Sequence, residues 1–474
     1  MKRKSIGVLS RAYCVYMLAL VCTLGTAHAE GTAKLPNTSA GKVLADWLSA
    51  FNSGDAAQLS KFTRRHKSPI ELERDQGFRE ISGGLDLLRI EKSEPRSIEA
   101  LARMRDADDV VLIDLSVKPG APRIIDKFER HGADIPPEFA PPRISFAELA
   151  RSATQKGDAM AAGKGFSGNL LVARQGEVVF AHSWGLADRS TKTAVDLDTR
   201  FRIASMYKMF TAVATLQLVD AGMLSLDKTV GAYLPGYPNA DVADKVTLRE
   251  LLAHTGGTGE VFTQEFFDQR EALREHADYL KVFGHRAPEF EPGSQDGYSN
   301  YGFILLGAII EKTSGKSYYD YVREKIFAPA GMQNTDALPE ADIKGQLSVG
   351  YTHGEHGLEP NTDTLPYRGT AAGGGYSTAG DLLKFATALQ DGRLLSMKRY
   401  EEAIRPQNLG HWYGYGFMVG GTGSTRWFGH EGGAPGMNGR LYVYPELGYV
   451  VVSLANVDDG ADRLASFIAN RLPI

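Results

Sequence analysis

The sequence predicts an α+β protein in which a small α+β domain precedes a larger one, an antiparallel sheet flanked by helices with an added helical region. Strand-like segments occur near both ends of the region 144–474, and helix-like segments lie between them. A proline-rich stretch from Pro136 to Pro142 separates this region from the residues before it. Proline favours extended, semi-rigid linkers, so this stretch is the expected domain boundary. The length of 474 residues also favours two domains over one.

The N-terminus has the pattern of a secretory signal. Basic residues at 2–4 precede a mostly apolar run at 13–24, and Ala27-His28-Ala29 is a small-residue cleavage site. We therefore expect a signal peptide at 1–29, cleavage near Ala29, and export to the periplasm or the medium. Cys14 and Cys22 are the only cysteines and both lie in this signal, so the mature chain is expected to have no disulfide.

The charge of the mature chain argues against nucleic acid or an anionic membrane as a partner. The full sequence has a formal charge of −4, and the signal holds four basic residues and no acidic ones, so cleavage leaves −8. Phosphates and anionic lipids are bound by basic surfaces. No segment after the signal is apolar over enough residues for a transmembrane helix. The sequence leaves the oligomeric state open.

Residues 30–135 are expected to form the small α+β domain. Apolar residues recur at helical spacing from Val43 to Phe51, and a second helix begins near Ala56. Short β-rich runs follow at 87–90, 98–101, 110–113 and 124–128. This order resembles the cone-shaped nuclear-transport-factor-like or cystatin-like folds. We find no catalytic set here, so a packing or dimerisation role is favoured over ligand binding.

The larger domain is expected at 144–474, after a linker at 136–143. Helices are predicted at 146–160, 201–221, 248–253, 301–312, 318–326 and 461–471. Strands are predicted at 169–173, 178–181, 440–444 and 449–454. Because the strands lie at both ends of the region, we expect one antiparallel sheet assembled from both.

Ser205 and Lys208 form the first motif with chemical meaning. They are three residues apart near the beginning of the helix predicted at 201–221, so their side chains share one face. A helix N-terminus stabilises a developing alkoxide and lowers the pKa of a nearby amine. A Ser-x-x-Lys pair also arises by chance in a chain of this length. This motif therefore indicates a catalytic site only if further motifs accompany it.

Tyr298-Ser299-Asn300 is the second motif, at the end of a loop that precedes the helix predicted at 301–312. Tyr298 offers a hydroxyl for proton transfer, and Asn300 offers an amide for a substrate. Tyr237-Pro238-Asn239 has the same spacing, but Pro238 removes a backbone donor and the segment reads as a turn, so Tyr298 is preferred.

His430-Glu431-Gly432-Gly433 is the third motif and precedes a strand-rich segment. Its glycines allow a substrate backbone to approach closely. His254-Thr255-Gly256 is an alternative, but it closes the helix predicted at 248–253 and precedes Tyr298. We interpret His254 as part of a structural turn and prefer His430.

In order and spacing, the three motifs resemble the serine hydrolases of the β-lactamase and penicillin-binding protein superfamily, nearest to the class C-like branch. That branch includes D-alanyl-D-alanine carboxypeptidases, esterases, D-amino-acid amidases and class C β-lactamases. The resemblance covers residues 146–474, and the stretches 201–205, 222–227, 251–255 and 373–378 support it.

The resemblance implies an acyl-enzyme mechanism without a metal or other cofactor. Ser205 would be the nucleophile, and Lys208 with Tyr298 would handle its proton; which of the two is the base stays open. The substrate would be bound by the remaining motif residues, Asn300, His430, Gly432 and Gly433. The backbone N–H groups of Ser205 and Gly433 would form the oxyanion hole.

Two departures from the family pattern bear on the substrate. His430 stands where lysine is common and is expected to titrate near neutrality, and Glu431 stands where threonine or serine is common. Both weaken the case for binding a carboxylate. We therefore predict an exported serine hydrolase of small esters, amides or D-amino-acid peptides. The alternatives are a penicillin-binding or sensing module with slow deacylation, or a weak class C-like β-lactamase.

Other motifs do not favour a different chemistry. The segment 375–379 lacks the last glycine of a nucleophile elbow, and Ser377 with Thr378 fits a helix cap. His353 and His356 lie in a glycine-rich loop with no third ligand nearby. The sequence therefore predicts no metal site.

Overall fold

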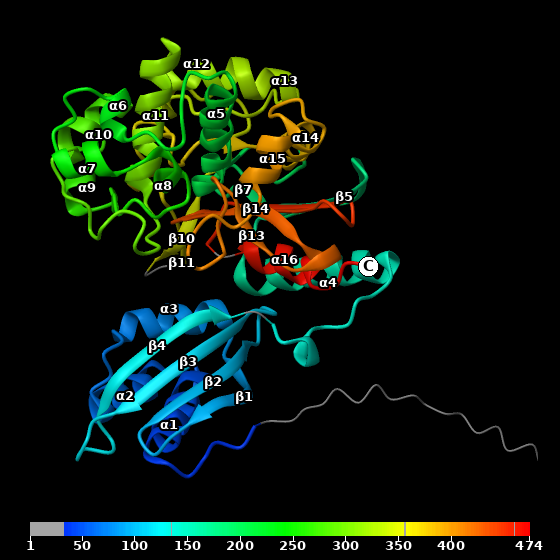
Figure 1. Ribbon diagram of the computed structural model, residues 1–474. Helices are drawn as coiled ribbons and strands as arrows, with labels where there is room; N and C mark the ends of the chain where they lie inside the picture. Colours follow the sequence, from blue (N-terminus) through cyan, green and yellow to red (C-terminus); the bar gives the residue numbers. More distant parts are fainter. Residues whose placement is uncertain (1–32, 134, 355–356, 459) are drawn as a thin grey trace, which may run out of the picture.

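The computed structural model describes residues 33–474 except 134, 355–356 and 459, so the predicted signal at 1–29 lies outside the described residues. Figure 1 shows a smaller N-terminal region below a larger one that contains the C-terminus. Within the described part of the chain, no helix has the length and hydropathy that crossing a bilayer requires.

The N-terminal region packs three helices against a four-stranded sheet. The helices are α1 Ser39–Ser53, α2 Ala56–His66 and α3 Leu72–Ser82, and the strands are β1 Leu85–Ser93, β2 Ser97–Met104, β3 Val110–Val117 and β4 Ile125–Ala133. The strands are antiparallel in sequence order. Trp47 on α1 is fully buried, stacked on Phe51 and edge-on to Phe128 of β4. α3 is an addition to the predicted elements: its sequence is mostly polar, so helical periodicity gave no signal for it.

The larger region contains a six-stranded antiparallel sheet built from both of its ends. Its strand order is β13-β14-β15-β16-β5-β6. The strands are β5 Gly168–Arg174, β6 Glu177–Trp184, β13 Met418–Gly420, β14 Trp427–Ala434, β15 Met437–Tyr444 and β16 Tyr449–Ala455. The predicted fold class, an antiparallel sheet flanked by helices, is therefore confirmed.

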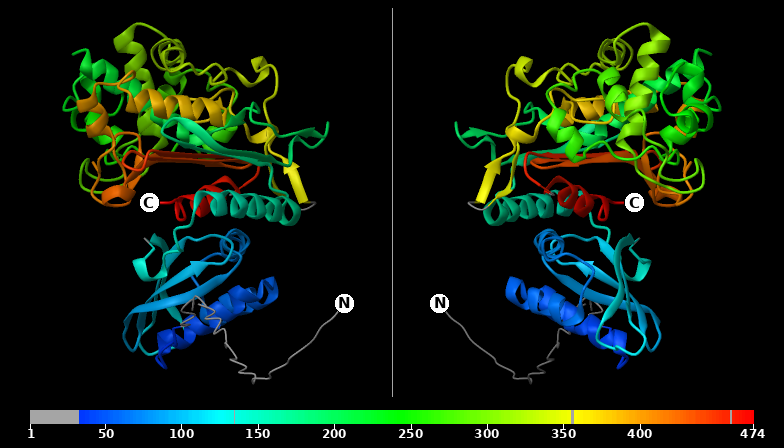
Figure 2. Two further views of the ribbon diagram at one scale, coloured as in Figure 1. Left: turned by 90° about the vertical axis from the view of Figure 1, so that its right-hand side faces the viewer. Right: turned by 90° about the vertical axis from the view of Figure 1, so that its left-hand side faces the viewer.

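Helices cover both faces of this sheet, which explains why β15 and β16 are buried along their whole length. Leu170 and Val172 of β5 pack with α4 Phe146–Lys164 and α16 Gly460–Ala469, whereas Leu171 and Ala173 pack with α5 Lys208–Asp220 and α14 Ala379–Gln390. The alternation is the two-residue period of a strand. Figure 2 shows α4 and α16 between the sheet and the N-terminal region.

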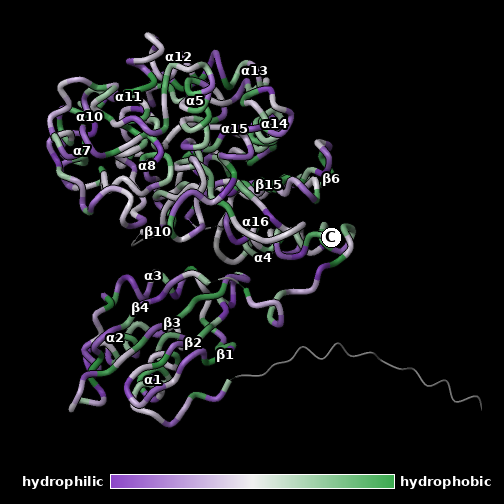
Figure 3. The backbone as a smooth tube through the Cα atoms, viewed as in Figure 1, coloured by the Kyte–Doolittle hydropathy of each residue, from purple (hydrophilic) through white to green (hydrophobic). Residues whose placement is uncertain are grey.

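The remaining helices form a cluster on the far side of the sheet. They are α6 Val230–Tyr233, α7 Ala240–Lys245, α8 Leu248–Leu252, α9 Gln264–Gln269, α10 His276–Phe283, α11 Asn300–Ser314, α12 Tyr318–Val322, α13 Ala328–Ala330 and α15 Met397–Ala403. α5 and α11 are buried on nearly all sides. Figure 3 shows hydrophobic residues along α5 and mainly hydrophilic ones along α7 at the outer edge.

Among the described residues, three pairs of short strands lie outside the large sheet. β7 Leu186–Asp188 pairs with β8 Thr193–Ala194, and β10 Tyr351–Gly354 pairs with β11 Gly357–Pro360. The third pair, β9 Phe201–Arg202 with β12 Tyr376–Ser377, lies next to Ser205.

The two regions contact each other through the turn between β2 and β3. Asp108 in this turn forms an ion pair with Arg471 after α16, with a second contact of 3.0 Å between Arg471 Nη2 and Asp108 Oδ1. Lys156 on α4 donates from Nζ to the Asp106 carbonyl at 2.8 Å. Between the regions the chain passes through a 3-10 turn, Pro137–Phe139, in the proline-rich stretch.

Candidate active site

Ser205 lies in a 3-10 turn, Ala204–Tyr207, that leads directly into α5. The predicted helix at 201–221 is therefore wrong in its first turns, because residues 201–202 form β9 and Ile203 N–H donates to the Gly375 carbonyl. Ala204 has a φ of 44°, a left-handed conformation that non-glycine residues rarely adopt. Such strain, next to a nucleophile, is typical of functional sites.

Lys208 is fully buried at the first position of α5. Its Nζ lies 3.2 Å from Ser205 Oγ, 2.6 Å from Asn300 Oδ1 and 2.6 Å from the Ala372 carbonyl. Burial lowers its pKa to about 7, and Glu260 opposes that shift. A neutral amine has two N–H donors and one lone pair, which suits two acceptors and one hydroxyl donor. The site therefore supports a neutral lysine that accepts the Ser205 proton.

Tyr298 and Asn300 lie where a loop enters α11. Ser299 caps this helix by accepting a hydrogen bond from Gly302 N–H. Tyr298 is 39% exposed and lines the cavity that contains Ser205. Burial raises the pKa of its phenol, while a hydrogen bond with Ser205 acts in the opposite direction. Because a phenol is protonated at neutral pH even without such a shift, Tyr298 carries its proton there.

Asn300 connects Lys208 to an acidic residue that the sequence analysis missed. Its Oδ1 accepts from Lys208, and its Nδ2 donates to Glu260 Oε2 at 2.7 Å. The other oxygen of Glu260 accepts from the backbone N–H groups of Val261 and Phe262. Glu260 follows a glycine-rich loop after α8, and no motif in the sequence marks it. Asn300 also lines the cavity, so its predicted substrate contact stays open.

The third motif lies on β14, and its histidine is buried. His430 is 1% exposed, its Nε2 lies 2.8 Å from the Tyr413 hydroxyl, and its Nδ1 donates to the Glu431 carbonyl. Burial lowers its pKa to about 3, so the expectation that His430 titrates near neutrality is wrong. It does not occur among the described residues that line the cavity, and its substrate-binding role stays a prediction.

The two glycines of this motif have different surroundings. A Cβ on Gly432 would lie 2.1 Å from the Ile203 carbonyl, so only glycine allows β14 to pack this closely against the turn before Ser205. A Cβ on Gly433 would meet nothing within 4 Å, and Gly433 lines the cavity beside Ser205. Gly433 is thus open to a substrate, as the predicted oxyanion hole requires.

Three candidates that the sequence analysis set aside, Tyr237, Ser377 and His353, do not line this cavity. Tyr237 is buried and hydrogen-bonded to Tyr301, outside this cavity. Ser377 is fully buried and bonded to Thr335, and His353 lies in β10. No cluster of three metal-ligating side chains occurs in the described ranges, and His356 lies outside them.

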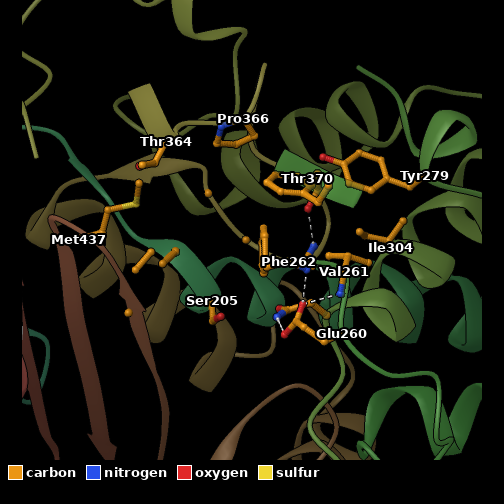
Figure 4. Close-up of a pocket in the computed structure, with 18 of the residues that line it drawn as sticks. Ser205, Glu260, Val261, Phe262, Tyr279, Ile304, Thr364, Pro366, Thr370 and Met437 are labelled. Atoms are coloured by element: carbon orange, nitrogen blue, oxygen red, sulfur yellow. Dashed lines mark hydrogen bonds between the residues drawn. The ribbon is translucent and has the colours of Figure 1, made fainter. Parts of the chain in front are cut away.

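The cavity beside Ser205 has a volume of about 440 Å³ and is mainly apolar. Five aromatic side chains line it, Phe262, Phe266, Phe267, Tyr279 and Tyr298, together with Ile304 and Met437. Figure 4 shows Ser205 and Glu260 near one end, with Tyr279 and Ile304 across the cavity from Met437. A site of this shape can hold an apolar group next to a nucleophile and a carboxylate.

Comparisons with known proteins agree with this arrangement. The chain is 29% identical to penicillin-binding protein 4* of Bacillus subtilis over 317 residues, which is 63% of this chain and 69% of that protein. It is 26% identical to a D-aminopeptidase of Brucella anthropi over 314 residues, 65% of this chain and 59% of that protein.

Solved structures and a family model also match the larger region of this chain. The D-amino acid amidase of Ochrobactrum anthropi SV3, solved with D-phenylalanine, matches 68% of this chain and 98% of its own with a TM-score of 0.59 and 27% identity. The penicillin-binding protein of Bacillus halodurans matches 65% of this chain and 97% of its own, with a TM-score of 0.59 and 32% identity. The beta-lactamase family model matches residues 153–472. The chain therefore belongs to the beta-lactamase family, as a serine hydrolase that acts through an acyl-enzyme.

Proposed function

We propose that the protein hydrolyses amides or esters of D-amino acids that have a free amino group and an apolar side chain. The observation that carries this proposal is the position of Glu260. Its carboxylate lines the same cavity as Ser205, Phe262 and Tyr279. A carboxylate can bind the ammonium group of an aminoacyl substrate while the aromatic rings take its side chain.

The preference for D-amino acids rests on the relatives. The matched relatives include a D-aminopeptidase and a D-amino acid amidase. Within the proposal, the amino group and the side chain occupy fixed subsites. The configuration of the substrate α-carbon, D or L, then decides whether the substrate carbonyl faces Ser205. A substrate of the wrong hand that kept both contacts would turn its carbonyl away from the nucleophile.

In this proposal Lys208 is the base that activates Ser205. As a neutral amine it takes the hydroxyl proton while Oγ forms a bond to the substrate carbonyl carbon. Its pKa of about 7 supports this role, because a base with a pKa near the working pH is both available and effective. The backbone N–H groups of Ser205 and Gly433 would hold the oxyanion.

Tyr298 is the proposed donor to the leaving group. Its side chain lines the cavity with Ser205, its ring centroid lies 4.8 Å from Lys208 Nζ, and its phenol retains its proton at neutral pH. It can pass a proton to the departing amine and recover one from Lys208, which leaves a neutral amine product and an acyl-enzyme on Ser205. Water then attacks the ester by the reverse sequence and releases the acid.

A penicillin-binding function with slow deacylation is the second candidate, because the relatives include penicillin-binding proteins. The third motif supports it less. His430 is buried and bonded to Tyr413, and burial holds its pKa far below neutrality, so it supplies no cation for a carboxylate. Intact mass after mixing with benzylpenicillin separates the cases: a lasting adduct on Ser205 supports this candidate, and drug consumption without an adduct indicates a β-lactamase.

We also propose export and a two-domain organisation. The sequence pattern at 1–29 supports cleavage near Ala29, and the proposed domains are 30–135 and 144–474 with a linker at 136–143. The separate apolar core of the N-terminal region supports this division. Mass analysis of the protein recovered from a periplasmic or culture fraction tests the cleavage.

The substrate proposal is tested with three compounds: D-phenylalanine amide, L-phenylalanine amide and N-acetyl-D-phenylalanine amide. We expect kcat/KM to be highest for the D-amide. N-acetylation removes the charge that Glu260 would bind and is expected to lower kcat/KM by roughly a hundredfold. Equal rates for the free and acetylated D-amides would contradict the proposal.

Two variants sharpen this test. Glu260→Gln should lower kcat/KM for the D-amide and leave the acetylated compound nearly unchanged. Glu265→Gln is the matched control, since Glu265 is paired with Arg286 and does not occur among the residues that line the cavity. Ser205→Ala gives the background rate. A loss in Glu260→Gln that is equal for both D-amides would show a structural role only.

A further inference from the structure

His254, interpreted from the sequence as part of a structural turn, lies directly behind Tyr298. It follows α8, is 1% exposed and has a φ of 59°. This left-handed conformation ends the helix and turns the side chain inward. The predicted turn is therefore present, but the imidazole ring of His254 packs against Tyr298 in the active site.

Both backbone neighbours of Tyr298 are hydrogen-bonded to His254. The carbonyl of His254 accepts from Gly297 N–H at 2.8 Å, and its Nδ1 accepts from Ser299 N–H at 3.0 Å. The imidazole also contacts the phenol ring itself, with 4.2 Å between centroids and 36° between planes. Tyr298 is thus held by His254 from both sides along the chain and at its ring.

The same imidazole contacts the residues that surround the third motif. Its centroid lies 4.5 Å from that of Tyr413, whose hydroxyl binds His430. Since Nδ1 accepts a hydrogen bond, a neutral ring carries its proton on Nε2. That atom is buried and has no hydrogen-bond partner among the described residues. An unsatisfied buried donor destabilises a fold, so stability alone does not account for a histidine here.

We propose that His254 is a positioning residue that holds the Tyr298 phenol against Ser205 and Lys208. The inference rests on the proposed proton-transfer role of Tyr298. His254 does not line the cavity within the described chain, so it acts through Tyr298 and makes no contact with the substrate. Its loss is expected to lower kcat and to leave KM nearly unchanged.

Two substitutions at His254 separate the effect of its hydrogen bond with Ser299 N–H from the effect of its imidazole ring. Glycine and asparagine both tolerate the left-handed backbone at this position. His254→Asn places an amide oxygen where Nδ1 accepts from Ser299, whereas His254→Gly removes both the acceptor and the ring. We expect His254→Gly to lower kcat by about tenfold or more, and His254→Asn to recover part of that loss. Hydrolysis of D-phenylalanine amide measures the rate, because its amine leaving group needs the proton that Tyr298 would donate, whereas the nitrophenolate of p-nitrophenyl acetate departs without one and gives the control rate.

A double-mutant cycle with Tyr298→Phe gives the decisive result. If His254 acts by positioning the phenol hydroxyl, its substitution should have little further effect once that hydroxyl is absent. The same fold-loss in both backgrounds would show a general structural effect and overturn the proposal. If Tyr298→Phe alone leaves the rate unchanged, the proposed role of Tyr298 fails, and the positioning role fails with it.

A control variant separates positioning from the loss of a buried histidine as such. His66 in the N-terminal region is 1% exposed, and its Nδ1 is bonded to the Arg123 carbonyl at 2.7 Å. His66→Asn should leave kcat unchanged in both backgrounds. Thermal unfolding confirms that each variant is folded, and His254→Asn carries the test if His254→Gly does not fold.

Discussion

The two regions of the molecule bury a cation in opposite ways. In the N-terminal region, the Arg130 side chain is 10% exposed, and its Nη1 lies 2.6 Å from Oδ1 of Asp75, which is fully buried. Trp47 donates to the other oxygen of Asp75, and the guanidinium lies over the Phe78 ring at 4.3 Å. Lys208 is also fully buried, but its described partners are a hydroxyl, an amide oxygen and a carbonyl.

The difference separates a structural cation from a reactive one. Arginine stays protonated in proteins, so burying it requires a counter-charge such as Asp75. Lysine loses its proton more easily when it is desolvated, and the site around Lys208 favours this loss because it offers neutral acceptors. The first arrangement stabilises a fold, and the second suits the base that we propose.

The substitution Lys208→Arg gives the strongest test of this difference between Arg130 and Lys208. Lys208→Arg places a permanent cation beside Ser205, so no group at that position can accept the hydroxyl proton. We expect kcat/KM for p-nitrophenyl acetate to fall by roughly a thousandfold. Retention of more than a tenth of the activity in a folded variant would show that Lys208 is not the base.

Removing the counter-charge of Arg130 tests the other half of the comparison. Asp75→Ala leaves a buried guanidinium unpaired, and the free energy of unfolding should fall by about 3 kcal/mol or more. Urea denaturation measures this loss. The double variant Asp75→Leu with Arg130→Met should recover most of it, since the pair is then replaced by apolar side chains. A single variant as stable as the parent would mean that the pair has no structural role.

Lys208→Met is expected to stabilise the protein in a pH-dependent way. The unfolded chain binds the lysine proton below about pH 10.5, whereas the folded protein releases it above about pH 7. Burial of Lys208 is therefore most unfavourable below pH 7, and the penalty disappears as pH rises toward 10.5. The gain from methionine should be on the order of 2 kcal/mol near neutrality. Thermal unfolding from pH 6 to pH 10 checks this trend; a gain that grows with pH would contradict it.

The pH dependence of catalysis should follow the same group. In the proposed mechanism the neutral form of Lys208 is the base, so kcat/KM should rise about tenfold per pH unit below a pKa of about 7 and level off above it. His430 should not contribute near neutrality, because burial lowers its pKa to about 3. A rate profile from pH 5 to pH 9 measures this. A rate that is still rising steeply at pH 9 would contradict Lys208 as the base and favour the Tyr298 phenolate instead.

The sequence by itself determined which reactive residues would meet in the site, Ser205, Lys208 and Tyr298, and most of the regular elements. The residue types at Ser205, Lys208 and Tyr298 carry their reactivity wherever they lie close together, and their order along the chain was enough to predict the family. Strand pairs such as β15 and β16 were predictable because their patterns are local: apolar runs separated by short turns.

Tertiary structure decided what depends on contacts between distant segments. The turn before Ser205 is not helical because Ile203 pairs with Gly375, a residue far along the chain. Glu260 reaches the site from a loop that no periodicity describes. The protonation of His430 depends on burial against Tyr413, which the sequence does not encode locally. Solvation and long-range packing set the pKa of Lys208 in the same way, and both exist only once the chain has folded.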